Sequence, residues 1–396
     1  MRETGTHEQK DILGRYDAVM MNAFGSPKRV FSHGEGIHLV DADGNRYVDL
    51  LAGIAVNSLG HNHPAVNAAI TSQLSRLGHV SNFFATQGQV QLAERLAAAA
   101  GEGARVFFTN SGTEANEAAF KVTRLTGRTR IVAMEGSFHG RTMGALALTH
   151  TPKYRAPFEP LPGHVEFVPF GDLEALERAV DGATAAVLLE PIQGENGILP
   201  LPQGYLAAAR RITRDAGALL WVDEVQTGIG RCGELLLHRA DGVTADLVTV
   251  AKGLGNGFPV GACIAVGDAA NLLQPGNHGS TFGGNPVAAA AANAVLDELA
   301  SGVLENVRQV GHWFAAAVEE LHHPLVDHVR GRGLLRGIVL TEDIGQGVVD
   351  AALDGGWVIN APRPHVLRIA PPLIITRDEL RPFVDALPAL LEAGRG

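Results

Sequence analysis

Residues 219–228 have the sequence Leu-Leu-Trp-Val-Asp-Glu-Val-Gln-Thr-Gly, in which an apolar run leads directly into two acidic residues. Short apolar runs without polar alternation are typical of strands that are buried on both faces, as in parallel sheets. The run predicts a strand over Leu219–Asp223, with Asp223 at the edge where such sheets carry their functional loops. A carboxylate at that depth needs a partner, either a structural salt bridge or the cationic ring nitrogen of a cofactor.

Six further apolar runs of similar length occur on either side of this one. We expect strands at Arg105–Thr109, Arg130–Met134, Val165–Pro169, Ala185–Glu190, Leu247–Ala251 and Gly261–Val266. Helical patterns separate several of them, for example Glu114–Thr126 and Tyr205–Ala216. Strands that alternate with helices predict an α/β fold, with a parallel or mixed sheet covered on both faces.

The two ends of the chain differ from this centre. A hairpin is predicted over residues 36–49, where Asp43-Gly44 is a turn signal. After about Asn285 we expect a helix at Pro286–Leu299, strands at Gly331–Leu340, Trp357–Asn360 and Val366–Ile369, and a terminal helix near Arg377–Leu391. We therefore expect a large domain at 64–285, a small α+β domain at 286–396, and an N-terminal segment, 1–63, that packs with the small domain.

The composition excludes several classes of protein. Lys and Arg total 32 and Asp and Glu total 42, and the net charge of −10 argues against nucleic acid or an anionic membrane as the main partner. Two cysteines cannot build a disulfide framework, and neither a secretory leader nor a membrane-spanning apolar run is found, so we expect a cytoplasmic protein. Glycine supplies 48 of the 396 residues, or about 12%, whereas its usual share is about 7%. That excess indicates backbone that turns tightly or approaches a ligand closely.

A second motif joins a predicted strand to a helix through small polar residues. It has the sequence Phe107-Phe-Thr-Asn-Ser-Gly-Thr-Glu-Ala-Asn-Glu, in which Ser111 and Glu114 fit a capping box. Backbone N–H groups at such a helix start, aided by hydroxyls, suit a phosphate group, although an ordinary helix cap has the same pattern. The motif is neither a P-loop nor a dinucleotide fingerprint.

A third motif places a lysine at the end of a predicted strand. Lys252 follows Leu247-Val-Thr-Val-Ala and precedes Gly253, Gly255 and Gly257. A partly desolvated lysine loses its proton more readily and becomes a nucleophile toward a carbonyl, whereas a surface lysine would leave the glycines unexplained. A phosphate-type cap, a strand-end Asp and a strand-end Lys together match what pyridoxal 5'-phosphate needs.

Six blocks, taken in order, resemble the class III (ω-amino acid) aminotransferases. They are Phe108-Thr-Asn-Ser-Gly-Thr-Glu-Ala-Asn-Glu, Ser137-Phe-His-Gly-Arg-Thr, Glu190-Pro-Ile-Gln-Gly-Glu, Val222-Asp-Glu-Val-Gln-Thr-Gly, Ala251-Lys-Gly and Gly279-Ser-Thr-Phe-Gly-Gly-Asn-Pro. The resemblance extends from about Gly36 to the last helix. It implies the type I fold of pyridoxal-phosphate enzymes, with a mostly parallel seven-stranded sheet flanked by helices in the large domain. It also implies a homodimer with shared active sites.

The resemblance assigns cofactor contacts to individual residues. Lys252 would form the Schiff base with the cofactor and then move protons, and Asp223 would pair with the pyridine nitrogen. The other implied contacts are Ser111, Gly112 and Thr113 at the phosphate, Thr281 at the phosphate of the neighbouring subunit, Phe138 on the ring face and Gln226 at the phenolic oxygen. Without the resemblance, Phe138 would be interpreted as a core aromatic residue.

Two arginines are the candidates for binding substrate carboxylates. The resemblance implies that Arg141 binds the carboxylate of an acylated ornithine and that Arg368 binds the α-carboxylate of 2-oxoglutarate or glutamate. Glu195 resembles the acid that masks Arg368 while the donor reacts. Ser280 is a further candidate contact to the substrate.

The implied reaction is a ping-pong transamination between N2-acetyl-L-ornithine and 2-oxoglutarate, giving N-acetyl-L-glutamate 5-semialdehyde and L-glutamate, in arginine biosynthesis. Ile54 stands where ornithine aminotransferases carry a tyrosine, and Ala85 replaces a bulky aromatic residue. An apolar, roomier pocket favours a donor whose α-nitrogen is acylated and uncharged. Succinylornithine, ornithine and 4-aminobutyrate are the alternative donors of the same class. No metal site is expected, because Cys232 and Cys263 lack zinc spacing.

Overall fold

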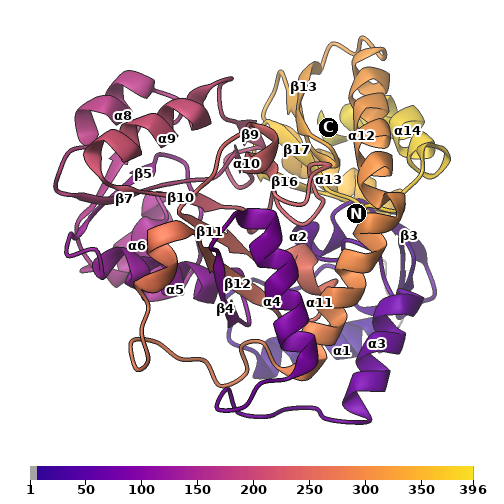
Figure 1. Ribbon diagram of the computed structural model, residues 1–396. Helices are drawn as coiled ribbons and strands as arrows, with labels where there is room; N and C mark the ends of the chain where they lie inside the picture. The colour runs from indigo at the N-terminus through magenta and orange to yellow at the C-terminus, as the bar shows by residue number, and fades with distance from the viewer. Residues whose placement is uncertain (1–6, 396) are drawn as a thin grey trace.

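A seven-stranded sheet forms the centre of the molecule. In the computed structural model, which describes residues 7–395, its strand order is β4-β12-β11-β10-β7-β5-β6 (Figure 1). In that order the strands are β4 (Arg105–Thr109), β12 (Gly261–Ala265), β11 (Leu247–Val250), β10 (Leu219–Asp223), β7 (Thr184–Leu189), β5 (Arg130–Met134) and β6 (Val165–Val168). Neighbours are parallel except at β12, which runs antiparallel to β11 and β4. The mostly parallel sheet of an α/β fold is confirmed.

Side chains along the central strands point into two separate apolar layers. Leu220 and Val222 of β10 belong to the same buried cluster as Ala209 of α9 (Tyr205–Ala216). Trp221 points the other way, into a cluster that includes Phe120 of α5 (Gly112–Arg124). Because helices cover both faces, the strands are continuously apolar, as their sequences predict. The first cluster also receives side chains from α4 (Gln87–Ala100) and α8 (Leu173–Ala179), and α6 (Met143–Leu148) contacts α5.

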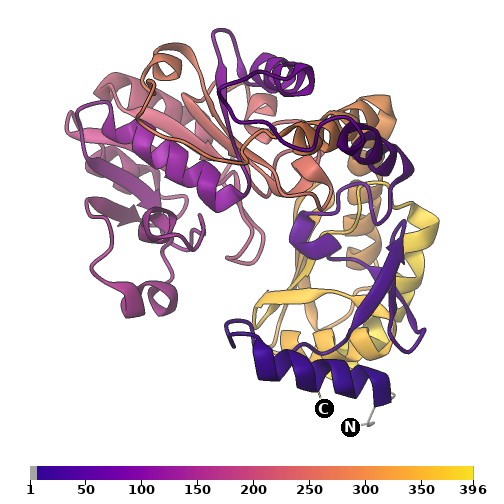
Figure 2. The same ribbon diagram turned by 90° about the horizontal axis from the view of Figure 1, so that it is seen from below.

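The N-terminal strands pair with a strand from near the C-terminus. β1 (Phe31–Glu35), β2 (His38–Asp41) and β3 (Arg46–Asp49) form an antiparallel meander, and β15 (Trp357–Val358) adds to β3 in parallel. The predicted hairpin turn at Asp43-Gly44 joins β2 to β3. Figure 2 shows the N-terminal segment, in indigo, beside the C-terminal elements, in yellow. The division of the chain at residues 63 and 285 stays a prediction.

A second four-stranded sheet lies near the C-terminus, and two expected strands are wrong in detail there. The sheet has the order β13 (Val326–Arg332), β14 (Leu335–Leu340), β17 (Val366–Ile369), β16 (Asn360–Arg363). The strand expected at Gly331–Leu340 is instead divided between β13 and β14, because the chain turns at Gly333, where φ is 57°. Likewise, the run Trp357–Asn360 is divided between β15 and β16, which belong to different sheets.

A long apolar helical run leads into the C-terminal part. α11 (Pro286–Glu298) continues through a kinked turn at Leu299–Val303 into α12 (Leu304–Glu319). By length and composition this run could cross a membrane, but 50% of its most apolar window is buried inside the protein, as in a core helix. The other elements are α1 (His7–Val19), α2 (Ala52–Ala55), α3 (Pro64–Leu74), α7 (Pro152–Arg155), α10 (Leu237–Ala240), α13 (Gly345–Asp354), α14 (Arg377–Arg395), β8 (Ile192–Gln193) and β9 (Leu199–Pro200).

Candidate active site

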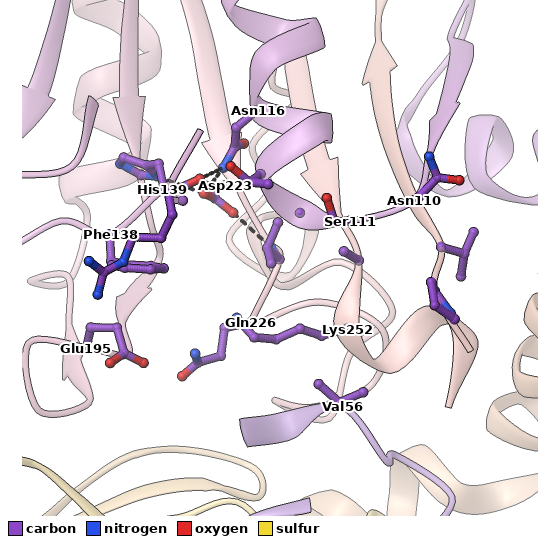
Figure 3. Close-up of a pocket in the computed structure, with 18 of the residues that line it drawn as sticks. Val56, Asn110, Ser111, Asn116, Phe138, His139, Glu195, Asp223, Gln226 and Lys252 are labelled. Atoms are coloured by element: carbon purple, nitrogen blue, oxygen red, sulfur yellow. Dashed lines mark hydrogen bonds and ion pairs between the residues drawn. The ribbon is translucent and has the colours of Figure 1, made fainter. Parts of the chain in front are cut away.

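A pocket of ≈ 440 Å³ opens at the carboxyl ends of the central strands (Figure 3). Its lining includes Ser111 after β4, Glu190 after β7, Asp223 at the end of β10 and Lys252 after β11. β10 pairs with both β7 and β11, so loops that are distant in sequence meet at one edge of the sheet. The strand order therefore builds the pocket where a parallel sheet carries ligands.

Lys252 follows β11 in a strained turn. Its φ is 43°, in the left-handed region that a non-glycine residue rarely adopts and that is concentrated at functional sites. Burial lowers the pKa of its ammonium group, and the carboxylates of Glu195 and Asp223 oppose that effect. Its Nζ makes no hydrogen bond or ion pair with another residue in the range 7–395. Lys252 is thus a lysine directed into the pocket with its amine unoccupied.

Asp223 is held from three sides at the end of β10. Its Oδ2 accepts hydrogen bonds from Asn116 Nδ2 at 2.9 Å and from His139 Nδ1 at 2.7 Å, and its Oδ1 accepts one from the N–H of Val225 at 2.9 Å (Figure 3). The residue is 4% exposed. Donors on both oxygens fix the orientation of the carboxylate at the edge of the pocket.

The start of α5 forms a second wall of the pocket. Ser111 is the N-cap residue, and its Oγ accepts from the N–H of Glu114 at 3.3 Å. The N–H groups of Gly112 and Thr113 donate to no other residue that the structure describes. Two free N–H groups at the positive end of a 13-residue helix are suited to an anion.

The expected capping box is wrong in one detail. The carboxylate of Glu114 does not return to the N–H of Ser111 but accepts from the N–H of Asn110 at 2.7 Å and from its Nδ2 at 2.8 Å. The N–H of Ser111 consequently stays open with those of the next two residues. Close packing also requires glycine at position 112, since a Cβ there would lie 2.6 Å from Cγ1 of Val225.

An ion pair closes another side of the pocket. Arg368, in β17, is 1% exposed, and its Nη1 donates to Glu195 Oε1 at 2.6 Å and to Gln226 Oε1 at 3.3 Å. Its Nε donates to Asn360 Oδ1 at 3.0 Å. Burial raises the pKa of Glu195, but the charge and hydrogen bond of Arg368, together with the charge of Lys252 and a hydrogen bond from Gln226, hold that pKa below its usual range. Glu195 and Gln226 line the pocket, and Arg368 lies behind them.

Arg141 also lines the pocket, but it is exposed, whereas Arg368 is buried. Arg141 makes no hydrogen bond or ion pair to another described residue. Its Cζ lies 3.5 Å from the ring centroid of Tyr154 and 5.5 Å from that of Phe138. A guanidinium with all its N–H donors free is available to a carboxylate that enters from solvent.

Two predicted residues do not reach the pocket of their own chain. Ser280 and Thr281 are not among its lining residues. Ser280 Oγ instead accepts from Asn110 Nδ2 at 3.3 Å, and Thr281 is exposed. Ile54 and Ala85, on which the preference for an acylated donor was based, do not line it either.

Sequence reasoning missed two residues of the pocket. Asn116 was not singled out, although it stands one helical turn after Gly112 and so shares its face of α5. Glu190 was quoted only within a block, yet it lines the pocket, is 7% exposed, and accepts from the N–H of Phe138 at 3.0 Å. Burial raises the pKa of Glu190 to about 7, against the lowering effect of His139. An acidic residue directly after a buried strand is the signal that identified Asp223 and applies equally here.

Among residues 7–395, no group of three or more His, Cys, Asp or Glu side chains is placed to hold a metal ion. Cys232 and Cys263 are buried free thiols.

Comparison with known proteins gives a consistent result. The family model for class III aminotransferases matches residues 21–391. The acetylornithine aminotransferase of Mycolicibacterium smegmatis is 58% identical over 382 residues, covering 96% of this chain and 98% of that protein. The crystal structure of N-acetylornithine aminotransferase from Stenotrophomonas maltophilia has a TM-score of 0.82 at 37% identity, covering 96% of this chain and 98% of that one. An ornithine aminotransferase structure from Toxoplasma gondii, with pyridoxal phosphate partially occupying the active site, has a TM-score of 0.93 at 32% identity, covering 98% and 94%.

Proposed function

The chain belongs to the class III aminotransferases, and we propose that it transfers the δ-amino group of N2-acetyl-L-ornithine to 2-oxoglutarate. The products would be N-acetyl-L-glutamate 5-semialdehyde and L-glutamate, in arginine biosynthesis. Class III aminotransferases use pyridoxal 5'-phosphate. The observation that carries the proposal is that Lys252 and Asp223, from the adjacent strand ends of β11 and β10, line one pocket together with the start of α5.

The donor groups of the pocket fit the cofactor's phosphate and ring. The open N–H groups of Gly112 and Thr113, with Ser111 beside them, would bind the phosphate. The carboxylate of Asp223 would hold the ring nitrogen through a charge-assisted hydrogen bond. When bound, the cofactor supplies a cationic conjugated ring that withdraws electrons from the carbon carrying the amino group.

Two further side chains would orient the ring. Phe138 would contact the ring face, and its backbone is fixed by the hydrogen bond from its N–H to Glu190. Gln226 would bind the phenolic oxygen; its Oε1 already accepts from Arg368, which fixes the side chain at that side of the pocket.

Lys252 would carry the protons of the reaction. Because burial lowers its pKa, a larger share of its side chain is the neutral amine that can accept a proton. Its Nζ, which has no partner among the residues that the structure describes, would take the proton from the δ-carbon of the donor and deliver it within the same pocket. Glu195 and Asp223 are other candidate bases, but their carboxylates already accept hydrogen bonds from Arg368 and His139.

Recognition of the two substrates would be divided between two arginines. Arg141, exposed and unpaired, would bind the carboxylate of acetylornithine. Arg368 would bind the α-carboxylate of 2-oxoglutarate or glutamate once Glu195 turns away from it. While the donor reacts, the Glu195 ion pair would keep Arg368 from attracting the donor's carboxylate into the wrong position.

We also propose a homodimer in which each subunit completes the other's site. Thr281 would bind the phosphate of the partner's cofactor, and Ser280 would contact substrate. Both residues lie outside the pocket of their own chain. The apolar side chains near them support a subunit contact, since Phe83 is 92% exposed, Phe84 66% and Phe282 58%. Light scattering on the active enzyme tests this, because a fully active monomer would contradict it.

A cytoplasmic location is proposed with the same reaction. The two buried thiols of Cys232 and Cys263 are unpaired, as expected under reducing conditions. The net charge of −10 does not favour nucleic acid or an anionic membrane surface as a partner.

A panel of donors tests the proposed function. N2-acetyl-L-ornithine, succinylornithine, ornithine and 4-aminobutyrate are each supplied with 2-oxoglutarate, and glutamate release is measured. We expect the highest kcat/KM with N2-acetyl-L-ornithine. A clear preference for 4-aminobutyrate would overturn the assignment of the donor.

A further inference from the structure

Tyr154 lies against Arg141 and has no role in the machinery described above. The Cζ atom of Arg141 is 3.5 Å from the centroid of the Tyr154 ring. The ring of Phe138 stands nearly perpendicular to that of Tyr154, with centroids 6.3 Å apart and an interplanar angle of 86°. The guanidinium of Arg141 is therefore placed in a corner made by two aromatic rings, 5.5 Å from the second centroid.

Tyr154 is itself anchored. It belongs to α7 and packs against an apolar cluster formed by Leu146, Ala147 and Leu161. Its hydroxyl makes no hydrogen bond to another described residue, so its ring, and not its polar end, is what it brings to the contact. A ring fixed on an apolar base offers a stable surface to the guanidinium.

The stacking leaves the donors of Arg141 unused. A guanidinium that stacks on an aromatic ring engages the ring with its face, while its N–H groups point outward in its own plane. Among residues 7–395, the five N–H donors of Arg141 have no hydrogen-bond partner, in contrast to those of Arg368. The same side chain can thus be held in place and still bind a carboxylate with two parallel hydrogen bonds.

An exposed arginine without such support would occupy many rotamers. Binding a carboxylate would then require the side chain to be ordered, which weakens the complex. A ring that restricts the guanidinium before the substrate arrives reduces the entropic cost of ordering the side chain, because the receptor is preorganised.

We propose that Tyr154 is a positioning residue that holds the Arg141 guanidinium at the pocket, so that the enzyme selects ω-amine donors that carry a carboxylate. The inference rests on the proposed role of Arg141 as the receptor for the donor carboxylate. Tyr154 does not touch the reacting atoms, and its effect passes through Arg141.

Two variants and two donors test the proposal. Tyr154→Phe keeps the ring, and Tyr154→Leu keeps the apolar packing without it. N2-acetyl-L-ornithine is compared with N-acetyl-1,4-diaminobutane, which has the same amine and acetyl group but no carboxylate. For Tyr154→Leu we expect a rise of about 2- to 5-fold in KM for acetylornithine, little change in kcat, and unchanged kcat/KM for the second donor. Tyr154→Phe should match the wild type.

A binding measurement provides a readout that does not depend on turnover. N-acetyl-L-norvaline has the carboxylate and acetyl group of the donor but no δ-amine. By calorimetry, its Kd should rise about 2- to 5-fold in Tyr154→Leu and stay unchanged in Tyr154→Phe. A second variant without a ring, Tyr154→Met, gives the same test if the leucine variant does not fold.

The outcomes separate this proposal from the one it rests on. If Arg141→Gln raises KM for acetylornithine and Tyr154→Leu does not, the positioning role of Tyr154 is overturned while that of Arg141 stands. If Tyr154→Leu impairs both donors equally, its role is structural and the proposal is also wrong. If Arg141→Gln leaves acetylornithine kinetics and norvaline binding unchanged, the assignment of Arg141 itself fails.

Discussion

Two regions of the pocket hold their arginines in opposite ways. Arg141 is exposed, is stacked on the ring of Tyr154, and forms no ion pair within the described part of the chain. Arg368 is 1% exposed, and Glu195 neutralises it at 2.6 Å. A buried guanidinium needs such a partner, whereas an exposed one does not. The difference suggests how one pocket serves two substrates, with one carboxylate receptor open at all times and the other available only after its partner has moved.

The largest effect should come from Lys252, which lines the same pocket. Replacing Lys252 with alanine removes the proposed proton carrier, and glutamate release should fall by about 10³-fold or more. The matched control is Lys10→Ala, which removes an exposed lysine outside the pocket. If the Lys252→Ala variant retained turnover, both arginines would be serving some other chemistry.

A smaller effect is expected when the mask on Arg368 is removed. In Glu195→Gln the ion pair is lost, and Arg368 can attract the donor's carboxylate, so KM for acetylornithine should rise about 3- to 10-fold. KM for 2-oxoglutarate should stay the same or fall. Glu342→Gln, which breaks an exposed ion pair with Arg395, is the control. If Glu195→Gln left KM for acetylornithine unchanged, the proposed masking of Arg368 by Glu195 would be wrong.

A third effect concerns stability and its dependence on pH. Burial raises the pKa of Glu190 to about 7, so the native state loses stability as pH rises from the unfolded value, near 4.5, through 7. Glu190→Gln removes that loss and can still accept the N–H of Phe138. Relative to the wild type, the variant should gain about 2 kcal/mol in free energy of unfolding between pH 5 and pH 8.

Urea unfolding at the two pH values measures this difference. The control is Glu174→Gln, which changes a glutamate whose side chain is 89% exposed. An equal difference between the Glu190 variant and the wild type at both pH values would argue that Glu190 is ionised throughout.

The strands that lead into the pocket could be predicted from the sequence to within a residue or two. β4, β5, β10 and β17 begin and end where expected, because each is a short apolar run with polar residues at its end. The error over Gly331–Leu340 has the opposite cause: the chain turns at Gly333, and the prediction did not treat this glycine, which follows Arg332, as a break between two strands. The ends of a strand can be predicted from local sequence only where polar residues mark them clearly.

Contacts across the pocket could not be predicted in the same way. Asp223 was singled out by its place after a strand, but its partners Asn116 and His139 are 107 and 84 positions away. The stack of Arg141 on Tyr154 likewise joins a loop to a short helix, and neither has a distinctive pattern. Such contacts depend on how elements pack, which the hydrophobic pattern of a single segment does not specify.

The most direct test of the account separates the two half-reactions in an Arg368→Gln variant. Each half-reaction is followed in a single turnover, first with acetylornithine and then, starting from the aminated enzyme, with 2-oxoglutarate. A double variant, Arg368→Gln with Glu195→Gln, controls for the carboxylate left unpaired. The account predicts that the half-reaction with 2-oxoglutarate slows by about 10²-fold while the half-reaction with acetylornithine stays within about twofold of the wild type. Equal slowing of both half-reactions would contradict the division of the substrates between the two arginines.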